Sequence, residues 1–102
     1  MLKPICIIPA RGGSKGIKRK NIRILGKKPL ISYSIKTALE SNLFQDVIVS
    51  TEDMEIAKIA KKYNGKIPFM RPSKLAKDTT TTEAVLLDVI KKLKDLEYYF
   101  DT

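Results

Sequence analysis

A glycine-rich basic segment near the N-terminus is the part of this sequence best suited to chemistry. Between positions 10 and 20 it holds three glycines and five Lys or Arg residues, and no acidic residue. Glycines leave successive backbone N–H groups uncovered, and such groups can form an anion-binding nest. Arg11 can hold two oxygens at once, and the lysines add compact positive charge. The segment therefore predicts a site for a polyphosphate.

Two familiar phosphate-binding patterns do not fit this segment. The dinucleotide pattern GxGxxG requires a residue between its first two glycines, whereas Gly12 and Gly13 are adjacent. The P-loop requires Lys and then Ser or Thr after its last glycine, but Ile17 follows Gly16. The pattern thus excludes both a Rossmann dinucleotide site and a Walker-type ATPase.

The elements that position this segment are read from apolar runs. Residues 4–9 form a continuous apolar run, which is typical of a buried strand in a parallel sheet. Residues 46–51 predict a second buried strand, and residues 66–70 predict a weaker third strand. Residues 10–28 lack sustained periodicity and are expected as a functional loop. Ligands bind beyond the carboxyl ends of parallel strands, which is where this loop emerges.

Helices are expected between and after these strands. Apolar spacing predicts one helix from Pro29 to about residue 42 and a second over 53–63. A third helix is expected to begin after Thr80, because Thr80 and Glu83 have the spacing of a capping box. Strands that alternate with helices predict an α/β fold, a parallel sheet with helices on both faces.

Composition narrows the function further. The chain has 102 residues, a net charge of +9, no His and one Cys, which excludes His-dependent nucleophiles, disulfides and Cys/His zinc sites. Its apolar runs are too short for a membrane span or a signal peptide, so a cytoplasmic location without a membrane partner is expected. Residues 1–39 hold 10 Lys/Arg and no acidic residue, whereas residues 40–102 hold 10 Lys/Arg and 11 Asp/Glu. The concentrated charge favours a phosphorylated small molecule over nucleic acid.

Four segments, in order, carry a resemblance to a known family. They are Ile8-Pro9-Ala10-Arg11-Gly12-Gly13-Ser14-Lys15-Gly16 with Lys20-Asn21-Ile22, Gly26-Lys27-Lys28-Pro29-Leu30-Ile31, Val47-Ile48-Val49-Ser50-Thr51-Glu52, and Arg71-Pro72 with Leu75-Ala76, Asp78-Thr79 and Thr82. Together they resemble the acylneuraminate cytidylyltransferases, or CMP-sialic acid synthetases. The family's second strand usually ends in Asp where this chain has Glu52, and Thr82 stands where the family often has Ser.

The resemblance implies a Rossmann-like nucleotidyltransferase fold and a reaction. Such enzymes join CTP to the anomeric hydroxyl of a nine-carbon sugar acid with Mg²⁺ and release pyrophosphate. Matched by motif, Arg11 and Lys20 would be the catalytic cations that neutralise the triphosphate. The implied nucleotide-binding residues are Ala10, Arg11, Gly12, Gly13, Ser14, Lys20, Asn21, Arg71 and Thr82. Arg71 and Thr82 would lie near the cytosine and ribose, and no metal ligand is assigned in this chain.

Family members are roughly twice as long, so residues 1–102 are expected to be the N-terminal, nucleotide-binding part of a truncated domain. The family continues into a core strand and a loop that helps form the sugar site, with later carboxylates that hold Mg²⁺. We therefore expect little or no activity from this chain alone. We also expect Tyr98, Tyr99 and Phe100 to lack part of their core, and the incomplete sheet to favour self-association.

Alternatives remain beside this interpretation. The acceptor could be another nonulosonic acid of the pseudaminic, legionaminic or Kdo type. The chain could instead be a basic nucleic-acid-binding module, or a non-catalytic piece that pairs with a partner completing the sheet. The first loop could be only solvated charge, and Thr82 only part of a helix cap. Cys6 is interpreted as a buried small hydrophobe, and Glu52 and Asp78 as surface carboxylates.

Overall fold

The sheet that carries the first loop is parallel, as the sequence predicts. The computed structural model describes residues 2–13, 23–77 and 79–101. Strand β1 (Cys6–Pro9) pairs with β4 (Val47–Ser50), with Cys6 opposite Val47 and Pro9 opposite Ser50. Hydrogen bonds continue the pairing beyond the strands, because the Ala10 N–H donates to the Ser50 carbonyl at 2.8 Å. The register of β1 against β4 is therefore kept up to Ala10, where the first loop begins.

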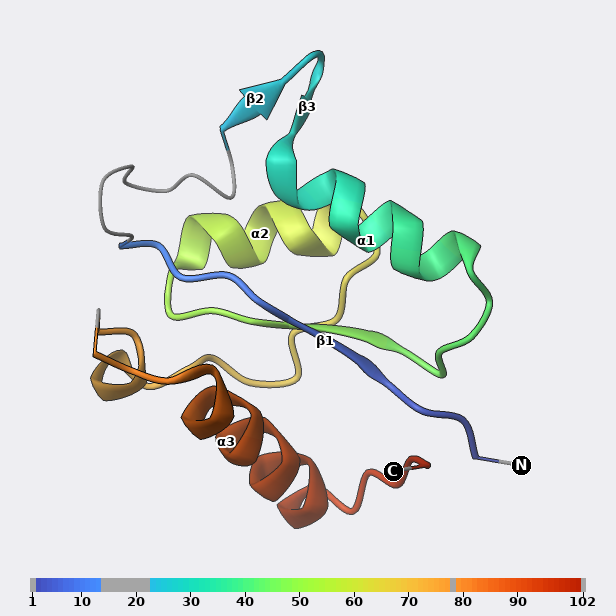
Figure 1. The fold of residues 1–102 in the computed structure, drawn as a ribbon, viewed down its shortest axis with the longest axis vertical. Coiled ribbons are helices and arrows are strands. Elements are labelled where there is room, and N and C mark those ends of the chain that lie inside the picture. Colours follow the sequence, from blue (N-terminus) through green and yellow to red (C-terminus); the bar gives the residue numbers. More distant parts are fainter. Residues whose placement is uncertain (1, 14–22, 78, 102) are drawn as a thin grey trace.

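Helices cover both faces of the sheet, which confirms the expected α/β architecture (Figure 1). Helices α1 (Leu30–Glu40) and α2 (Met54–Lys62) lie on one face, and α3 (Thr82–Asp95) lies on the other. Side chains along a strand alternate between the two faces. The cores on the two faces follow this alternation. The first contains Val47, Val49, Ile31, Ile35, Ile56 and Ala60, and the second contains Ile48, Val89 and Leu93.

The prediction of a third strand over residues 66–70 is wrong within the described part of the chain. Lys66 forms a single parallel bridge with Ile48, and its N–H donates to the Val47 carbonyl at 2.8 Å. Pro68 has no N–H to donate, so a regular ladder does not continue through this segment. After the interruption, the Arg71 N–H donates to the Thr51 carbonyl at 2.7 Å and brings the chain back to the sheet.

Two further expectations need correction. The segment expected as an irregular loop over residues 10–28 contains a short hairpin, β2 (Ile24–Leu25) and β3 (Lys28–Pro29), which turns at Gly26 with a φ of 69°. The cap of α3 is Thr81 rather than Thr80, because the Thr81 hydroxyl accepts the Ala84 N–H at 3.0 Å. The Thr80 hydroxyl instead accepts the Lys77 N–H, so it stabilises the preceding turn.

The remaining boundaries agree closely with the sequence pattern. Asp53 caps α2 by accepting the N–H groups of Glu55 and Ile56, and Asn64, with a φ of 71°, ends the turn after that helix. A 3₁₀ turn, η2 (Ser73–Leu75), lies in the loop before α3. Cys6 is half-buried against the α1 and α2 side of the core, and burial raises the pKa of its thiol. Within the described residues, no helix is long and apolar enough to cross a membrane.

The C-terminal segment lies against the second face of the sheet. Tyr98 and Phe100 are half-buried against the Ile48 cluster, whereas Tyr99 is exposed, so only two of the three aromatic residues enter a core. The Asp101 N–H donates to the Lys3 carbonyl at 2.9 Å. Among the described residues this is the only backbone hydrogen bond that joins the C-terminal segment to the chain just before β1.

We expect the open edge of β1 to cause self-association. In β1, every second residue forms backbone hydrogen bonds with β4. The residues between them direct their N–H and C=O groups away from β4, toward the other edge of the strand. An edge with unpaired N–H and C=O groups is a template for pairing with another chain. Sedimentation velocity over a wide concentration range should show a concentration-dependent dimer or larger species. A monomer at every concentration would contradict this expectation.

The contact between Tyr98 and Asp46 predicts a pH dependence of stability. The Tyr98 hydroxyl donates to an Asp46 carboxylate oxygen, and Lys66 Nζ lies 2.8 Å from the other. Burial opposes ionisation of Asp46, but the hydrogen bonds from Lys66 and Tyr98 outweigh it and lower its pKa. Because the folded state favours the ionised carboxylate, stability is present above a pH of about 4 and is lost as the pH falls through the lowered pKa.

Replacement of the tyrosine tests this contact. Tyr98→Phe should lower the free energy of unfolding by about 1 kcal/mol at neutral pH, and by less in acid where Asp46 is protonated. Urea unfolding at the two pH values measures the difference. Tyr99→Phe is the control, because the Tyr99 side chain is exposed. An equal loss for Tyr98→Phe at both pH values would argue against an ionised Asp46 as the partner.

Candidate functional site

The carboxyl ends of β1 and β4 form one edge of the molecule, because the two strands are parallel. In Figure 1 this edge lies on the left, where the starts of α2 and α3 also lie. The sequence-predicted residues Ala10 to Gly13 follow β1 directly, and Thr51, Glu52 and Asp53 follow β4. The fold therefore brings the first loop and the β4–α2 turn to the same place.

The first loop leaves the sheet from a buried position. Ala10 is fully buried in the core beside α1 and α2, Arg11 is half-buried and Gly13 is exposed. The loop thus begins inside the fold and reaches the surface within a few residues. Three of the predicted site residues, Ser14, Lys20 and Asn21, lie outside the described residues.

Gly12 makes the closest contact between the first loop and the β4–α2 turn. Its N–H donates to Glu52 Oε1 at 2.8 Å. A Cβ on Gly12 would lie 2.5 Å from Asp53 Oδ2 and 2.9 Å from Asp53 Cβ, so a larger residue has no room here. Asp53 is itself held as the cap of α2. Glycine is required at this position because the backbone of the first loop lies directly against the Asp53 side chain.

Arg71 reaches the same edge from the loop before η2 and is 5% exposed. Its Nε donates to Ser50 Oγ at 3.1 Å, and its Nη2 donates to the Ser50 carbonyl at 2.8 Å. A third bond runs from Nη1 to the Leu75 carbonyl at 3.4 Å. The guanidinium is therefore fixed against the end of β4 by the chain's own acceptors.

Charges of both signs surround Arg71. Burial lowers the pKa of Arg71, and nearby Arg11 pushes in the same direction, whereas the carboxylates of Glu52 and Asp88 oppose it. Asp88 lies on α3, with Oδ2 3.2 Å from Lys92 Nζ. Two guanidinium groups are thus gathered at one edge with carboxylates that partly balance them. An arginine remains charged despite such shifts, so the edge keeps two cations for an anionic ligand.

Thr82 begins α3, and the start of α3 lies on the same side of the molecule as the carboxyl ends of β1 and β4 (Figure 1). It is exposed, and its neighbour Thr81 caps the helix. Thr82 is therefore not the cap residue, and its hydroxyl is not needed for that purpose. The structure brings Ala10, Arg11, Gly12, Gly13 and Arg71 to one edge, and the start of α3 lies on the same side.

Sequence reasoning missed the part that Glu52 plays. Its interpretation as a surface carboxylate is wrong, because Glu52 is half-buried and accepts the Gly12 N–H. Its position directly after a buried strand, at the ligand-binding edge, was the available signal. Ser50 and Asp88 were also missed, since neither has a spacing pattern that points to Arg71.

The described residues do not form a metal site of their own. No group of three His, Cys, Asp or Glu side chains gathers in residues 2–13, 23–77 or 79–101. Glu52 binds the Gly12 N–H and Asp53 caps α2, so the two carboxylates nearest to the first loop already have roles. The described residues therefore do not fit a magnesium ion held by side chains alone.

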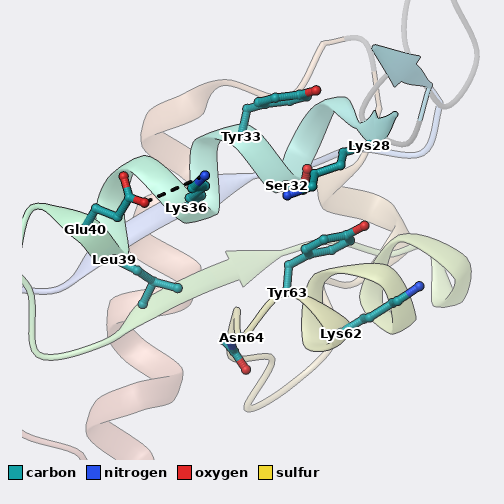
Figure 2. Close-up of a pocket in the computed structure, with 9 residues that line it drawn as sticks. All are labelled: Lys28, Ser32, Tyr33, Lys36, Leu39, Glu40, Lys62, Tyr63 and Asn64. Carbon is teal, nitrogen blue, oxygen red and sulfur yellow. Dashed lines mark ion pairs between the residues drawn. The ribbon is translucent and has the colours of Figure 1, made fainter. Parts of the chain in front are cut away.

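A crevice of about 320 Å³ lies elsewhere, between α1 and the end of α2 (Figure 2). Lys28, Lys36 and Lys62 line it, but none of the residues of the strand-end edge does. Lys36 lies 3.8 Å from Glu40, and Lys62 is in the last turn of α2, where a cation is favourable. Lys36 and Lys62 thus have local explanations, and the crevice lacks the residues of the first loop, so the strand-end edge is the better candidate site.

The family of the chain follows from comparison with known proteins. Residues 5–101 match the family model described as Cytidylyltransferase. The chain belongs to this cytidylyltransferase family. Over 100 aligned residues it is 47% identical to the pseudaminic acid cytidylyltransferase of Campylobacter jejuni. The aligned region covers 98% of this chain and 43% of that protein. Over 97 aligned residues it is 38% identical to the N-acylneuraminate cytidylyltransferase of Escherichia coli O18:K1:H7. This second alignment covers 95% of this chain and 23% of that protein.

A solved structure supports the same assignment for the fold. CMP:2-keto-3-deoxy-manno-octonic acid synthetase complexed with CTP superposes with a TM-score of 0.76 at 27% sequence identity. The match covers 88% of this cytidylyltransferase chain and 35% of that chain. The chain has the nucleotidyltransferase fold, and it spans less than half the length of these relatives.

Proposed function

We propose that this chain is the CTP-binding part of an enzyme that transfers CMP to a nine-carbon sugar acid. Family membership supports this proposal, and the observation that carries it is the strand-end edge. There the first loop, Arg11 and Arg71 gather beside the starts of α2 and α3. In the reaction, the anomeric hydroxyl oxygen of the sugar attacks the α-phosphorus of CTP. A new O–P bond forms, the bond to the β-phosphate oxygen breaks, pyrophosphate leaves, and the hydroxyl proton passes to solvent.

The roles of individual residues are part of this proposal. Arg11 and Lys20 neutralise the triphosphate, and Gly13 and Ser14 supply loop N–H groups. Asn21 contacts the nucleotide, and Arg71 and Thr82 lie beside the cytosine and ribose. Such chemistry needs mainly positioning and charge neutralisation, which suits a chain without His. Mg²⁺ is proposed to arrive with the triphosphate, as is usual for nucleotide-binding sites.

The proposed acceptor is a nonulosonic acid, that is, a nine-carbon sugar acid. Pseudaminic acid is the first candidate, because the Campylobacter jejuni relative is named for it and has the higher identity of the two reported relatives. The nine-carbon alternatives are N-acylneuraminate, which the family resemblance implies, and legionaminic acid. A Kdo-type acceptor, which has eight carbons, is the alternative outside this class.

Nucleotide titration tests the proposal on this chain. Calorimetric titration should show saturable binding of CTP, with and without Mg²⁺, and weaker binding of ATP, GTP and UTP. Arg11→Gln should weaken CTP binding roughly tenfold or more, because a charge-assisted contact is lost. Lys61→Gln is the control with the same change of charge, since Lys61 is exposed near the end of α2. Tight binding of a DNA or RNA oligomer that CTP does not displace would contradict the proposal and favour a nucleic-acid-binding module.

A chimera tests the transfer reaction. This chain would replace the matching N-terminal part of the Campylobacter jejuni enzyme, and pyrophosphate release would be followed with CTP, Mg²⁺ and pseudaminic acid. Turnover that depends on Arg11 is the expected result. The chain alone should release little or no pyrophosphate. A folded chimera that binds CTP but lacks turnover would argue against a catalytic role for this part.

A further inference from the structure

The carboxylate of Glu52 contacts the first loop and lies close enough to Arg71 for its charge to act there. One of its oxygens accepts the Gly12 N–H at 2.8 Å, and its charge acts on the guanidinium of Arg71, which Arg11 also influences. Glu52 comes directly after the buried residue Thr51, so its backbone is fixed by the sheet. A carboxylate at this position would repel the triphosphate that the site is proposed to bind, so its presence there calls for an explanation.

The hydrogen bond supplies one reason. A partly buried N–H that donates to a carboxylate makes a stronger bond than one to a neutral acceptor. Because the Gly12 N–H points to Glu52, it does not point to a phosphate bound at the outer side of the loop. The contact therefore determines which loop amides face the ligand, beginning with that of the exposed Gly13.

The charge of Glu52 supplies the second reason. Arg11 and Arg71 repel each other, and the loss of opposing carboxylates would favour their separation. Glu52 thus acts on the first loop through a hydrogen bond at Gly12 and through charge at Arg11.

We propose that Glu52 is a positioning residue that holds the first loop in the arrangement that receives the triphosphate. This inference rests on the proposed function, which it deepens by naming the group that orders the loop. Glu52 does not touch the reacting atoms. It holds the Gly12 N–H away from the ligand and keeps Arg11 beside Arg71.

Two variants separate the hydrogen bond from the charge. Glu52→Gln keeps an oxygen acceptor for the Gly12 N–H, whereas Glu52→Ala removes it. Exchange of the Gly12 amide with solvent, followed by NMR, should be at least about tenfold faster in Glu52→Ala and nearly unchanged in Glu52→Gln. Calorimetry should show CTP affinity reduced roughly tenfold by Glu52→Ala. For Glu52→Gln the loss of affinity should be smaller than for Glu52→Ala, because the hydrogen bond from Gly12 is kept while the charge that opposes the repulsion of Arg11 and Arg71 is lost.

Asp95→Asn is the control variant, since Asp95 is an exposed carboxylate in the last turn of α3. It should change neither amide exchange at Gly12 nor CTP affinity. Unchanged Gly12 exchange and CTP affinity in Glu52→Ala would overturn the inference. If that variant does not fold, a Glu52→Gln variant that loses protection of Gly12 would overturn it instead. Failure of the wild-type chain to bind CTP would refute the proposed function, and the exchange measurement would still decide whether Glu52 holds the loop.

Discussion

Gly12→Ala should destabilise the chain by about 1–3 kcal/mol, the usual effect of forcing extra volume into a well-packed site. The added Cβ would lie 2.5 Å from Asp53 Oδ2. Asp53 cannot turn away freely, because its Oδ1 accepts the Glu55 and Ile56 N–H groups at the start of α2. The loop must then move outward, which also breaks the bond from the Gly12 N–H to Glu52. Urea unfolding followed by circular dichroism measures the loss.

A neighbouring glycine and a double variant make this prediction specific. Gly13→Ala should be nearly neutral, since a Cβ there has no atom within 4 Å. Asp53→Gly should itself be mild, because glycine is tolerated as a helix cap at a loss of a few tenths of a kcal/mol. In the Asp53→Gly background, Gly12→Ala should lose most of its effect, as expected for residues in direct contact. Purely additive effects of the two substitutions would show that the contact with Asp53 is not the cause.

The same reasoning shows how far the sequence alone could predict this fold. The strands β1 and β4 were identified because a strand buried on both faces needs apolar residues in succession. The structure confirms the burial of β4, whereas β1 is only half-buried and ends in the exposed Pro9. The second helix was predicted over residues 53–63, and in the structure Asn64, with a positive φ that few residue types accept, lies just after it. These features depend on a few neighbouring residues, which a local pattern contains.

The errors have a different origin, because they depend on contacts between distant parts of the chain. The strand expected at residues 66–70 has a suitable apolar pattern, but Pro68 interrupts the hydrogen bonds that would hold it to β4. Thr80 and Thr81 are equally good cap residues by type, and only the geometry at the start of α3 selects Thr81. Local patterns do not contain that information.

The candidate site shows the same division. The motif around Arg11 is local, and its placement at the carboxyl end of β1 follows from the parallel sheet. The contact of Glu52 with Gly12 joins residues 40 positions apart, and that of Arg71 with Ser50 joins residues 21 apart. Spacing in the sequence does not encode such contacts. They form because β4 pairs with β1 on one side and contacts the segment before η2 on the other, so residues from all three segments meet at the end of β4.

Arg71→Met should lower the free energy of unfolding by about 2 kcal/mol, because charge-assisted hydrogen bonds are lost while the desolvation of a buried cation is relieved. Arg71 is 5% exposed, and its guanidinium donates twice to Ser50. Its loss leaves the buried Ser50 hydroxyl and carbonyl without these donors. Arg71→Lys should fall between the wild type and Arg71→Met, since an ammonium group keeps the charge but cannot reproduce the planar fork.

The Arg71 variants also separate a structural role from contact with the nucleotide. Ser50→Ala removes one acceptor of Arg71 and should cost about 1 kcal/mol, without changing the preference for CTP over UTP. If Arg71 also lies beside the cytosine, Arg71→Lys should reduce that preference by more than its effect on stability predicts. Calorimetric titration with the two nucleotides measures the preference. A parallel loss of CTP and UTP binding, in proportion to stability, would instead mean that Arg71 acts only by holding the end of β4 in place.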